Sequence, residues 1–386
     1  MSWYSRRFWL VPIAASILFA WSVWRFHDSQ TGFSSLVIFG ERMKPRLVPA
    51  IRDLPLALNA GGGYDGQFYV QMATDPFLRD PDIDRSLDLA PFRARRILFS
   101  WTAYVAGFGK PARIVEAYAL QNVVCWFALG LLAFHWFPPN TGRYVTLWLA
   151  TGFAGGLLWS VRASLADGPS LLVIALGVLA VERNRPWLSA ALFGIGGLGR
   201  ETNVLAAAAQ LEFKRTWGSV WRLALQLAVI ALPLVIWFDY LYSLYRSRMF
   251  TAGGVMAAPL EWFFWRWRAV VSDVAAAGWQ AESRFTLLIL VSLAVQALFI
   301  VVRPRWKDPW WRLGCAYLIL MLFFGRPVWE SDPSALRVLL PMNFAFNVLL
   351  TRVDRPYLFW PLVVAGNLSV LFGLHLMRVP GTTAWL

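Results

Sequence analysis

FTLLILVSLAVQALFIVV, residues 285–302, runs for eighteen residues without one charged side chain. A helix of this length covers most of the ~30 Å hydrocarbon core of a bilayer. Similar apolar runs of roughly 16 to 26 residues recur along the chain, separated by charged turns. The chain is 58% hydrophobic and has a mean hydropathy of +0.51 over 386 residues. The strands of a membrane β-barrel would instead show alternating apolar and polar residues. These features predict an all-α polytopic membrane protein.

We predict about ten transmembrane helices, all within a single transmembrane domain that covers residues 1–386. The first apolar run follows Arg6 and Arg7, and no A-x-A-like cleavage site comes after it. We therefore expect a retained first helix with its N-terminus in the cytoplasm. No fixed-period repeat is visible in the sequence. The predicted spans are residues 8–24, 113–136, 144–161, 167–182, 187–212, 219–244, 285–302, 310–324, 335–350 and 357–377.

The formal net charge of +14 does not indicate a nucleic-acid partner. The basic residues lie in short turns between apolar runs instead of along one face or tail. Cys125 and Cys315 both fall inside apolar runs, which argues against a disulfide framework or a thiolate metal site. The three histidines are scattered along the chain. We therefore expect no metal and no cofactor.

Residues 27–96 form a long polar segment in which nine acidic residues balance nine basic ones. A neutral loop is easier to place outside the membrane than a basic one. We expect this segment to be the first outer, periplasmic loop, with short interfacial helices near 33–39, 51–58 and 66–73. The apolar stretch 97–108 is too short for an ordinary span and suits a re-entrant segment.

The basic turns after this loop fall on one side of the membrane if 97–108 does not cross it. That side is then the cytoplasm, as the positive-inside rule requires. Asp65 and Glu330 are predicted to lie outside, and Lys214 and Lys307 inside. The basic turns contain Arg143, Arg183, Arg185, Lys214, Arg215, Arg303, Arg305, Lys307, Arg312, Arg352 and Arg355.

The other charged residues in or beside the spans gather on the predicted outer side. A charge near the centre of a transmembrane helix costs about 2.5 to 3.5 kcal/mol on insertion scales, so it tends to mark an ion or substrate site. A shared polar cavity in the outer leaflet would account for these residues together. They are Asp65, Arg93, Arg95, Arg96, Arg162, Asp167, Arg200, Glu201, Arg326, Glu330, Asp332 and Arg337.

GLGRETN, residues 197–203, interrupts the predicted span 187–212 with Arg200 and Glu201. Each glycine lowers helix stability by about 1 kcal/mol relative to alanine, which favours a break at this point. A broken helix could direct its polar residues into the cavity. The alternative is a structural ion pair with neighbouring helices.

GGGYDGQFYVQMATDP, residues 61–76, places Asp65 on a glycine-rich and aromatic segment beside the membrane. Asp65 could be the N-cap of a short helix that ends near Ala73, with Phe68, Tyr69 and Met72 as its membrane face. A carboxylate at a helix start could also be a catalytic base, with the glycines admitting a bulky substrate.

PFRARRILF, residues 91–99, carries Arg93, Arg95 and Arg96. These side chains could be snorkelling anchors beside a short apolar segment. Three arginines on the outer side nevertheless run against the positive-inside bias. Binding of an anionic phosphate headgroup would explain them.

The motifs GYDGQFY, PFRARRILF, RETN and SALRVLLP, together with the long first loop, resemble the GT-C superfamily of integral-membrane glycosyltransferases. The chain is most similar to bacterial members whose first loop carries a YDGQFYY-type motif, and the similarity extends from Arg6 to about Pro341. The resemblance implies a GT-C-like helical bundle. It also implies a donor sugar carried on a polyprenyl phosphate.

By this resemblance Asp65 is the general base, and Arg200, Arg93, Arg96 and Arg337 face the donor phosphate. Tyr64 stands where many members have a second carboxylate, which makes a metal-bound site less expected. The full set of predicted substrate-binding residues is Tyr64, Gln67, Tyr69, Arg93, Arg96, Arg162, Asp167, Arg200, Glu201, Glu330 and Arg337.

The expected activity is an inverting hexosyl or pentosyl transfer at the outer face of the bacterial inner membrane. The expected partners are membrane lipid, the lipid-linked donor, and a glycan, glycolipid or protein acceptor. The main alternative is a lipid or sugar transporter or flippase. Many transporters contain internal repeats, and none is visible in this sequence. A phosphotransferase or acyltransferase would depend on a nucleophile or metal cluster that the sequence does not suggest.

Overall fold

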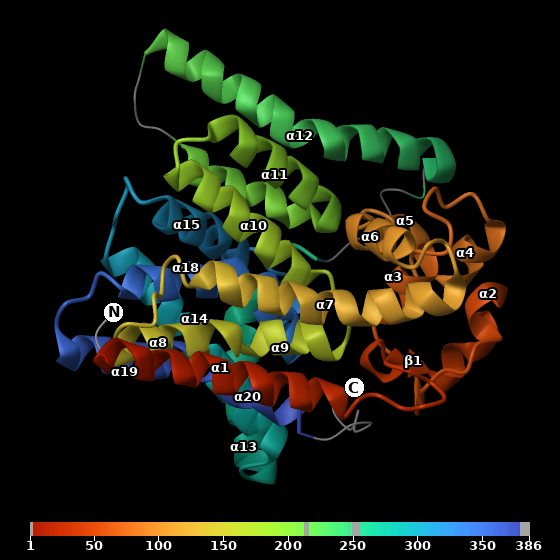
Figure 1. Cartoon of the computed structure of the whole chain (residues 1–386), viewed down its shortest axis with the longest axis horizontal. Helices are drawn as coiled ribbons and strands as arrows, with labels where there is room; N and C mark the ends of the chain where they lie inside the picture. The colour runs from red at the N-terminus through yellow and green to blue at the C-terminus, as the bar shows by residue number, and fades with distance from the viewer. Residues whose placement is uncertain (1–2, 212–215, 247, 249–254, 379–386) are drawn as a thin grey trace.

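The computed structural model describes residues 3–211, 216–246, 248 and 255–378. Nearly all of its secondary structure is helical, which confirms the predicted all-α class. Figure 1 shows most of the long helices running along the longest axis of the molecule, with the short elements of the first loop gathered at one end.

Four helices in the described part of the chain are long and apolar enough to cross a membrane, and two bent helix pairs pass the same test as pairs. The pairs are bent by 42° and 43° at short breaks. The four are α1 (Trp3–Trp24), α7 (Pro111–Ala133), α12 (Trp217–Tyr245) and α14 (Ala281–Val302). The pairs are α8 (Gly142–Gly152) with α9 (Gly155–Arg162), and α19 (Pro356–Gly366) with α20 (Ser369–Leu376).

All six segments coincide with predicted spans. The other predicted spans are occupied by shorter helices, so the number of crossings stays a prediction. These helices are α10 (Asp167–Glu182), α11 (Pro186–Gly199), the 3-10 helix η3 (Glu201–Gln210), α15 (Pro309–Leu322), α17 (Asp332–Val338) and α18 (Leu340–Leu350).

The prediction of one broken crossing at 187–212 is wrong, because α11 and η3 form a hairpin. At 1.5 Å per α-helical residue and about 2.0 Å per 3-10 residue, the two arms have similar lengths of about 20 Å. Gln210, at the end of η3, donates to the carbonyl of Pro186, at the start of α11, at 3.0 Å. The chain therefore returns to the end from which it came, and Arg200 lies at the tip. This return agrees with the predicted sidedness, because the basic turns at Arg185 and Lys214 were both expected inside and a single crossing would have separated them.

The basic turns of the predicted cytoplasmic side lie together at one end of the bundle. Arg143 donates to the carbonyl of Asp354 at 3.5 Å, and Arg352 pairs with Asp308 at 2.8 Å. Glu182, at the end of α10, accepts hydrogen bonds from two tryptophan indoles of the neighbouring turns. Two residues of the predicted set, Lys214 and Arg215, lie outside the described residues.

The first loop folds into short elements at the opposite end. Its only sheet within the described residues is a parallel pair of two-residue strands, with Phe39 opposite Leu58. The elements are η1 (Ser34–Leu36), β1 (Phe39–Gly40), η2 (Glu41–Arg46), α2 (Pro49–Arg52), β2 (Leu58–Asn59), α3 (Gly66–Met72), α4 (Pro81–Ser86) and α5 (Ala90–Arg93).

Two of the three expected interfacial helices of this loop, near 33–39 and 66–73, are instead buried inside the protein. Every residue of α3 is buried, including Phe68, Tyr69 and Met72, which were predicted to face the membrane. Residues 36–39 are almost fully inaccessible. In the third predicted helix, 51–58, only Ile51 is buried, and the helix α2 ends at Arg52. An apolar helix face can bury itself against lipid or against protein, and here α3 packs against α6 and α7.

The segment 97–108 contains α6 (Leu98–Ala106), which has nine residues. At 1.5 Å per residue this helix is about 14 Å long, less than half of the ~30 Å hydrocarbon core. The length agrees with the expected re-entrant segment.

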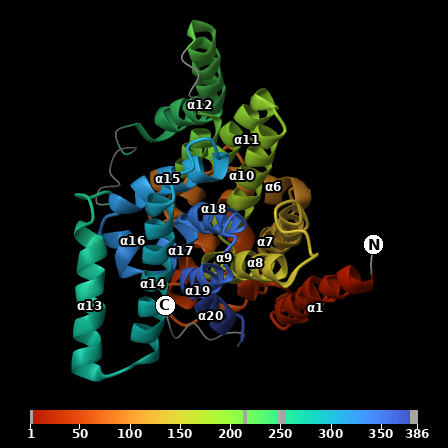
Figure 2. The same cartoon turned by 90° about the vertical axis from the view of Figure 1, so that its left-hand side faces the viewer.

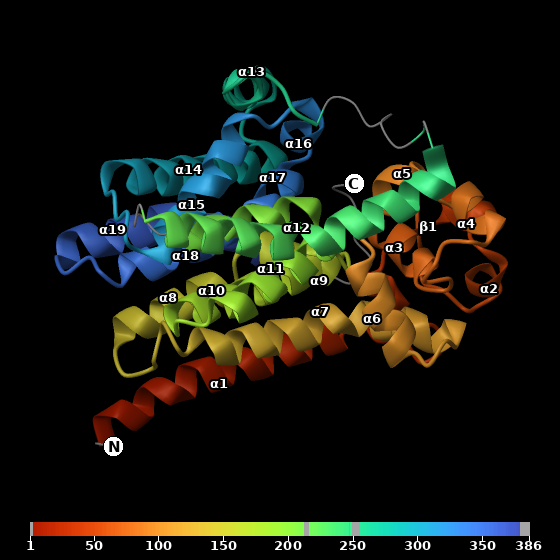
Figure 3. The same ribbon diagram turned by 90° about the horizontal axis from the view of Figure 1, so that it is seen from above.

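Two helices between 245 and 335 were not foreseen from the sequence. They are α13 (Glu261–Ala277) and the short α16 (Arg326–Glu330). Figure 3 shows α13 at the edge of the molecule beside α14 and α16, on the side away from α1. Their aromatic side chains meet, since the rings of Phe263 and Trp329 lie 5.3 Å apart.

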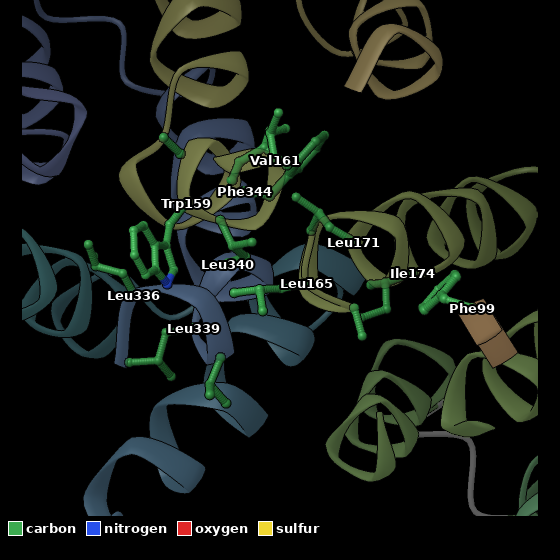
Figure 4. Packing of buried hydrophobic residues seen from close by; sticks show 14 of the residues in the cluster. Phe99, Trp159, Val161, Leu165, Leu171, Ile174, Leu336, Leu339, Leu340 and Phe344 are labelled. Atoms are coloured by element: carbon green, nitrogen blue, oxygen red, sulfur yellow. The ribbon is translucent and has the colours of Figure 1, made fainter. Parts of the chain in front are cut away.

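The apolar core positions α9 directly against α17. Figure 4 shows Trp159 of α9 beside Leu336 of α17. Gly156 makes the approach possible, because a Cβ atom at this position would lie 2.5 Å from the carbonyl oxygen of Leu336. The contact fixes the place of Arg337, the next residue along α17.

Sidedness can be tested with cysteines at exposed positions, in a chain whose Cys125 and Cys315 are replaced by serine. We expect an impermeant thiol reagent to label Asp53→Cys and Glu330→Cys in intact cells, because both lie on the predicted outer side. Lys307→Cys should be labelled only after the cells are opened. Labelling at position 307 in intact cells would contradict the topology.

Candidate active site

Asp65 lies immediately before α3, where two glycines let the chain pack closely. A Cβ atom at Gly66 would lie 2.4 Å from the carbonyl oxygen of Ala163, so only glycine fits against the end of α9. Gly63 has φ +73°, a conformation that other residues rarely adopt. These two glycines therefore serve the packing of the protein. That the glycines beside Asp65 admit a substrate stays a prediction.

The carboxylate of Asp65 is held between two arginines. Its Oδ1 lies 2.9 Å from Nη1 of Arg93, and its Oδ2 lies 2.8 Å from Nη1 of Arg337. The side chain makes no hydrogen bond that caps α3, so the N-cap interpretation is not supported. The structure thus joins the first loop to α17, 272 residues later in the chain.

Asp65 is ionised in this arrangement. Its side chain is 16% exposed, and burial by itself would raise the pKa of the carboxyl. The positive charges of Arg337 and Arg93 outweigh that effect and hold the pKa of Asp65 well below its ordinary value. A carboxylate that is held in this way is a weak base.

Arg93 also binds Asp88, which was not among the predicted site residues. Its Nε and Nη2 atoms donate to the two oxygens of Asp88 at 2.9 and 2.7 Å. The guanidinium group also lies over the ring of Phe68, 4.8 Å from the centroid. Asp88 is more exposed than Asp65, at 39% of its side chain, and lies at the outer rim of the group.

Arg337 extends the group toward the interior of the bundle. Its Nε lies 4.0 Å from Oδ2 of Asp167, and Oδ1 of Asp167 accepts from Nη1 of Arg200. Arg200 comes from the tip of the α11–η3 hairpin. The Nε atoms of Arg200 and Arg337 are buried and have no hydrogen-bond partner among the described residues. Unused buried donors of this kind favour an anionic ligand.

A second pair closes the group beside Arg200. Arg96 binds Glu201 with two parallel hydrogen bonds of 3.0 Å each, and its Nη1 donates to the hydroxyl of Tyr69 at 3.0 Å. Such two-point contacts fix a guanidinium group in one orientation. The pair also anchors the start of α6 to the hairpin tip.

We call these residues the charge cluster. It contains four arginines and four carboxylates, so it is neutral as a whole. Burying ions is costly unless every charge is compensated, which explains why the cluster is balanced. Its members are Asp65, Asp88, Arg93, Arg96, Asp167, Arg200, Glu201 and Arg337.

Four predicted site residues have other contacts. Tyr64 lies beside the cluster, where its hydroxyl accepts from the indole of Trp159 at 3.3 Å. Gln67 binds the backbone of Gly40 and Gly62 and so supports the loop.

Arg162 and Glu330 form no ion pair with the cluster. The Arg162 guanidinium donates to the carbonyl of Ser35 at 3.0 Å and lies over the ring of Phe26. Glu330 pairs with Arg326 on the surface at 2.6 Å. Both residues were predicted to belong to the site because each carries a charge next to a predicted span. Such a position does not show which residue the charge contacts.

Within the described residues, no three His, Cys, Asp or Glu side chains are grouped so that they could hold a metal ion. The carboxylates of the charge cluster face arginines instead. The expectation that the site needs no metal or cofactor stays a prediction.

No family model and no curated protein matches the chain. Among solved structures, the crystal structure of ArnT from Cupriavidus metallidurans in the apo state is similar, with 16% sequence identity and a TM-score of 0.47. The match covers 91% of this chain and 61% of that one, so the chain spans less than two thirds of its length. A likeness at this level carries no functional argument.

The Arg96–Glu201 pair should be needed for stability. We expect Arg96→Gln to lower the free energy of unfolding by about 3 kcal/mol, because the substitution leaves the largely buried Glu201 carboxylate without its partner. Thermal unfolding of the purified protein, followed by tryptophan fluorescence, measures the effect.

The matched control is Arg326→Gln, which breaks the exposed pair with Glu330. It should cost less than about 1 kcal/mol. Adding Glu201→Gln to Arg96→Gln should restore part of the loss, since the unpaired charge is then removed. Equal effects of Arg96→Gln and Arg326→Gln would contradict the importance of the buried pair.

Proposed function

We propose that the protein is a GT-C-type glycosyltransferase that moves a sugar from a polyprenyl-phosphate donor to an acceptor at the outer face of the bacterial inner membrane. The observation that carries the proposal is the Asp65 carboxylate held between Arg93 and Arg337 in a buried, neutral cluster. The resemblance of the first-loop motif to this superfamily supports the same function.

The donor phosphate is proposed to take the place of the Asp65 carboxylate on the two arginines. A sugar linked to a polyprenyl phosphate is a phosphodiester with one negative charge, and its oxygens match the donors of a guanidinium group. The Nε atoms of Arg337 and Arg200, which have no hydrogen-bond partner among the described residues, offer further hydrogen bonds. The polyprenyl chain would lie among the helices.

Asp65 becomes a stronger base when the donor binds. Without donor, the two arginines hold its pKa low. Once the phosphate takes over their N–H groups, the carboxylate loses the stabilisation of its charged form, and its pKa rises toward the ordinary value of an aspartate. A carboxylate positioned in this way can accept the proton of a sugar hydroxyl in the transition state.

The proposed transfer is one displacement that conserves the charge of the site. The acceptor oxygen bonds to the anomeric carbon, the bond from that carbon to the phosphate oxygen breaks, and the acceptor proton goes to Asp65. The configuration at the anomeric carbon is inverted. Polyprenyl phosphate leaves with one more negative charge, which the arginines of the charge cluster stabilise more strongly than they do the bound donor. No cofactor is required.

The acceptor is proposed to be a glycan, a glycolipid or a protein that reaches the cluster from the outer side. Asp88 lies at this rim. The alternative function is a lipid or sugar transporter or flippase, which would use the same cluster to hold a phosphate but would leave the sugar bond intact.

The test of this function is release of polyprenyl phosphate. The purified protein in sealed lipid vesicles is given polyprenyl-phosphate sugars labelled in the sugar, together with an envelope extract as acceptor source. We expect one sugar of the panel to yield free polyprenyl phosphate and a labelled acceptor. Movement of intact donor across vesicles, without release of polyprenyl phosphate from any sugar, would favour the transporter.

A further inference from the structure

An apolar groove with a cavity volume of about 690 Å³ lies between α1, α8, α19 and α20. Its volume is in the range of ~300 to 1,000 Å³ that is typical of small-molecule sites. Figure 2 shows α1 standing apart from α19 and α20, with α8 between them. The sides of the groove come from the two ends of the chain.

The walls of the groove are suited to a hydrocarbon chain. Among the described residues that line it, only three have uncharged polar side chains, namely Ser22, Thr146 and Asn367. The two hydroxyls donate to backbone carbonyls, and Asn367 is hydrogen-bonded to other asparagines. Their hydrogen-bonding needs are met by the protein, so nothing in the walls requires a polar ligand.

Two arginines line the groove at one end. Arg25 follows the last turn of α1, and Arg378 follows the last turn of α20. A hydrogen bond of 3.1 Å from Ser22 to the carbonyl of Met377 holds these two helix ends together. Neither arginine forms an ion pair with a described residue, and both are exposed. Both lie on the predicted outer side, where the positive-inside rule disfavours uncompensated arginines.

The groove is separate from the charge cluster, because α9 lies between them. Leu158 of α9 lines the groove. The next residue, Trp159, lies on an adjacent face of the helix and contacts Tyr64, with ring centroids 5.0 Å apart. Consecutive residues of a helix point about 100° apart, so the two faces are distinct. An anion held by Arg25 and Arg378 is therefore not the phosphate that Asp65 faces.

We propose that this groove binds an anionic phospholipid of the outer leaflet, with one acyl chain along the groove and its phosphate at Arg25 and Arg378. Charge complementarity at the mouth favours this ligand, and so does an apolar interior whose polar groups are already hydrogen-bonded. The lipid fills the space between α1 and α20. It thereby supports α9, whose adjacent face carries the contact to Tyr64.

The test compares phosphatidylglycerol with phosphatidylcholine on delipidated protein in detergent, by native mass spectrometry. We expect phosphatidylglycerol to be retained and phosphatidylcholine to be lost. The double substitution Arg25→Gln and Arg378→Gln should weaken phosphatidylglycerol binding by about 30-fold, which corresponds to about fivefold for each arginine near an anionic headgroup.

The matched control removes two positive charges at the opposite end of the bundle, with Arg305→Gln and Lys307→Gln, and should leave binding unchanged. Leu371→Trp fills the groove without changing any charge, and it should also reduce binding. Equal retention of both lipids would overturn the proposal. Unchanged binding in the Arg25 and Arg378 variant, or displacement of phosphatidylglycerol by equimolar polyprenyl phosphate, would do the same.

Discussion

Asp65→Asn should lower the turnover of donor by about 10²-fold or more. Asparagine has nearly the shape of aspartate, but its amide cannot accept the acceptor proton, and general-base catalysis is typically worth 10²- to 10⁴-fold. The measurement is the rate of polyprenyl-phosphate release at saturating donor, with donor affinity and thermal stability determined on the same preparation. Since Asp65 makes no capping hydrogen bond, Asp65→Ala should lose turnover to a similar extent.

Asp53→Asn and Asp88→Asn are the controls for this substitution. Asp53 is an exposed carboxylate of the same loop, with 75% of its side chain accessible, and its loss should have no effect. Asp88 binds Arg93, as Asp65 does, but forms no ion pair with Arg337. Asp88→Asn therefore tests whether turnover depends on Asp65 itself or on any carboxylate that binds Arg93. An Asp65→Asn enzyme with normal turnover would remove Asp65 from the mechanism.

Arg337→Lys should reduce turnover by on the order of 10²-fold, the effect of removing one preorganised donor to a developing negative charge. Arg337 binds Asp65 through Nη1 and directs Nε toward Asp167. Lysine keeps the charge but offers a single point of contact on a flexible chain, so it cannot reproduce the planar fork. The effect should fall on kcat more than on the binding of donor, because the phosphate gains its second charge only as the sugar bond breaks.

Arg326→Lys is the control, since Arg326 is exposed and pairs only with Glu330 among the described residues. Steady-state kinetics of both variants give the separation of kcat from KM. Turnover of Arg337→Lys equal to that of the wild type would mean that Arg337 has no geometric role toward the phosphate.

Much of the charge cluster could be predicted because buried ions are costly. Asp167, Arg200, Glu201 and Arg337 interrupt apolar helices, and such an interruption marks a residue whatever its partner is. The same rule selected Arg162, which binds a backbone carbonyl and an aromatic ring instead. Sequence shows that a charge needs compensation, whereas only the fold shows what supplies it.

Other features could not be predicted, for reasons that are local. Asp88 is one of several acidic residues in a polar loop, where exposed carboxylates are common. Only its contact with Arg93 in the folded protein distinguishes it from the others. The apolar face of α3 is as compatible with lipid as with protein.

The central claim is that the donor phosphate and the Asp65 carboxylate compete for Arg93 and Arg337. The most direct measurement is the affinity of the purified protein for polyprenyl phosphate, by native mass spectrometry, in the wild type and in Asp65→Asn, with uncharged polyprenol as the reference ligand. If the two anions compete, Asp65→Asn binds polyprenyl phosphate more tightly than the wild type, while polyprenol binding is the same in both. Equal or weaker binding of polyprenyl phosphate by Asp65→Asn would contradict the account.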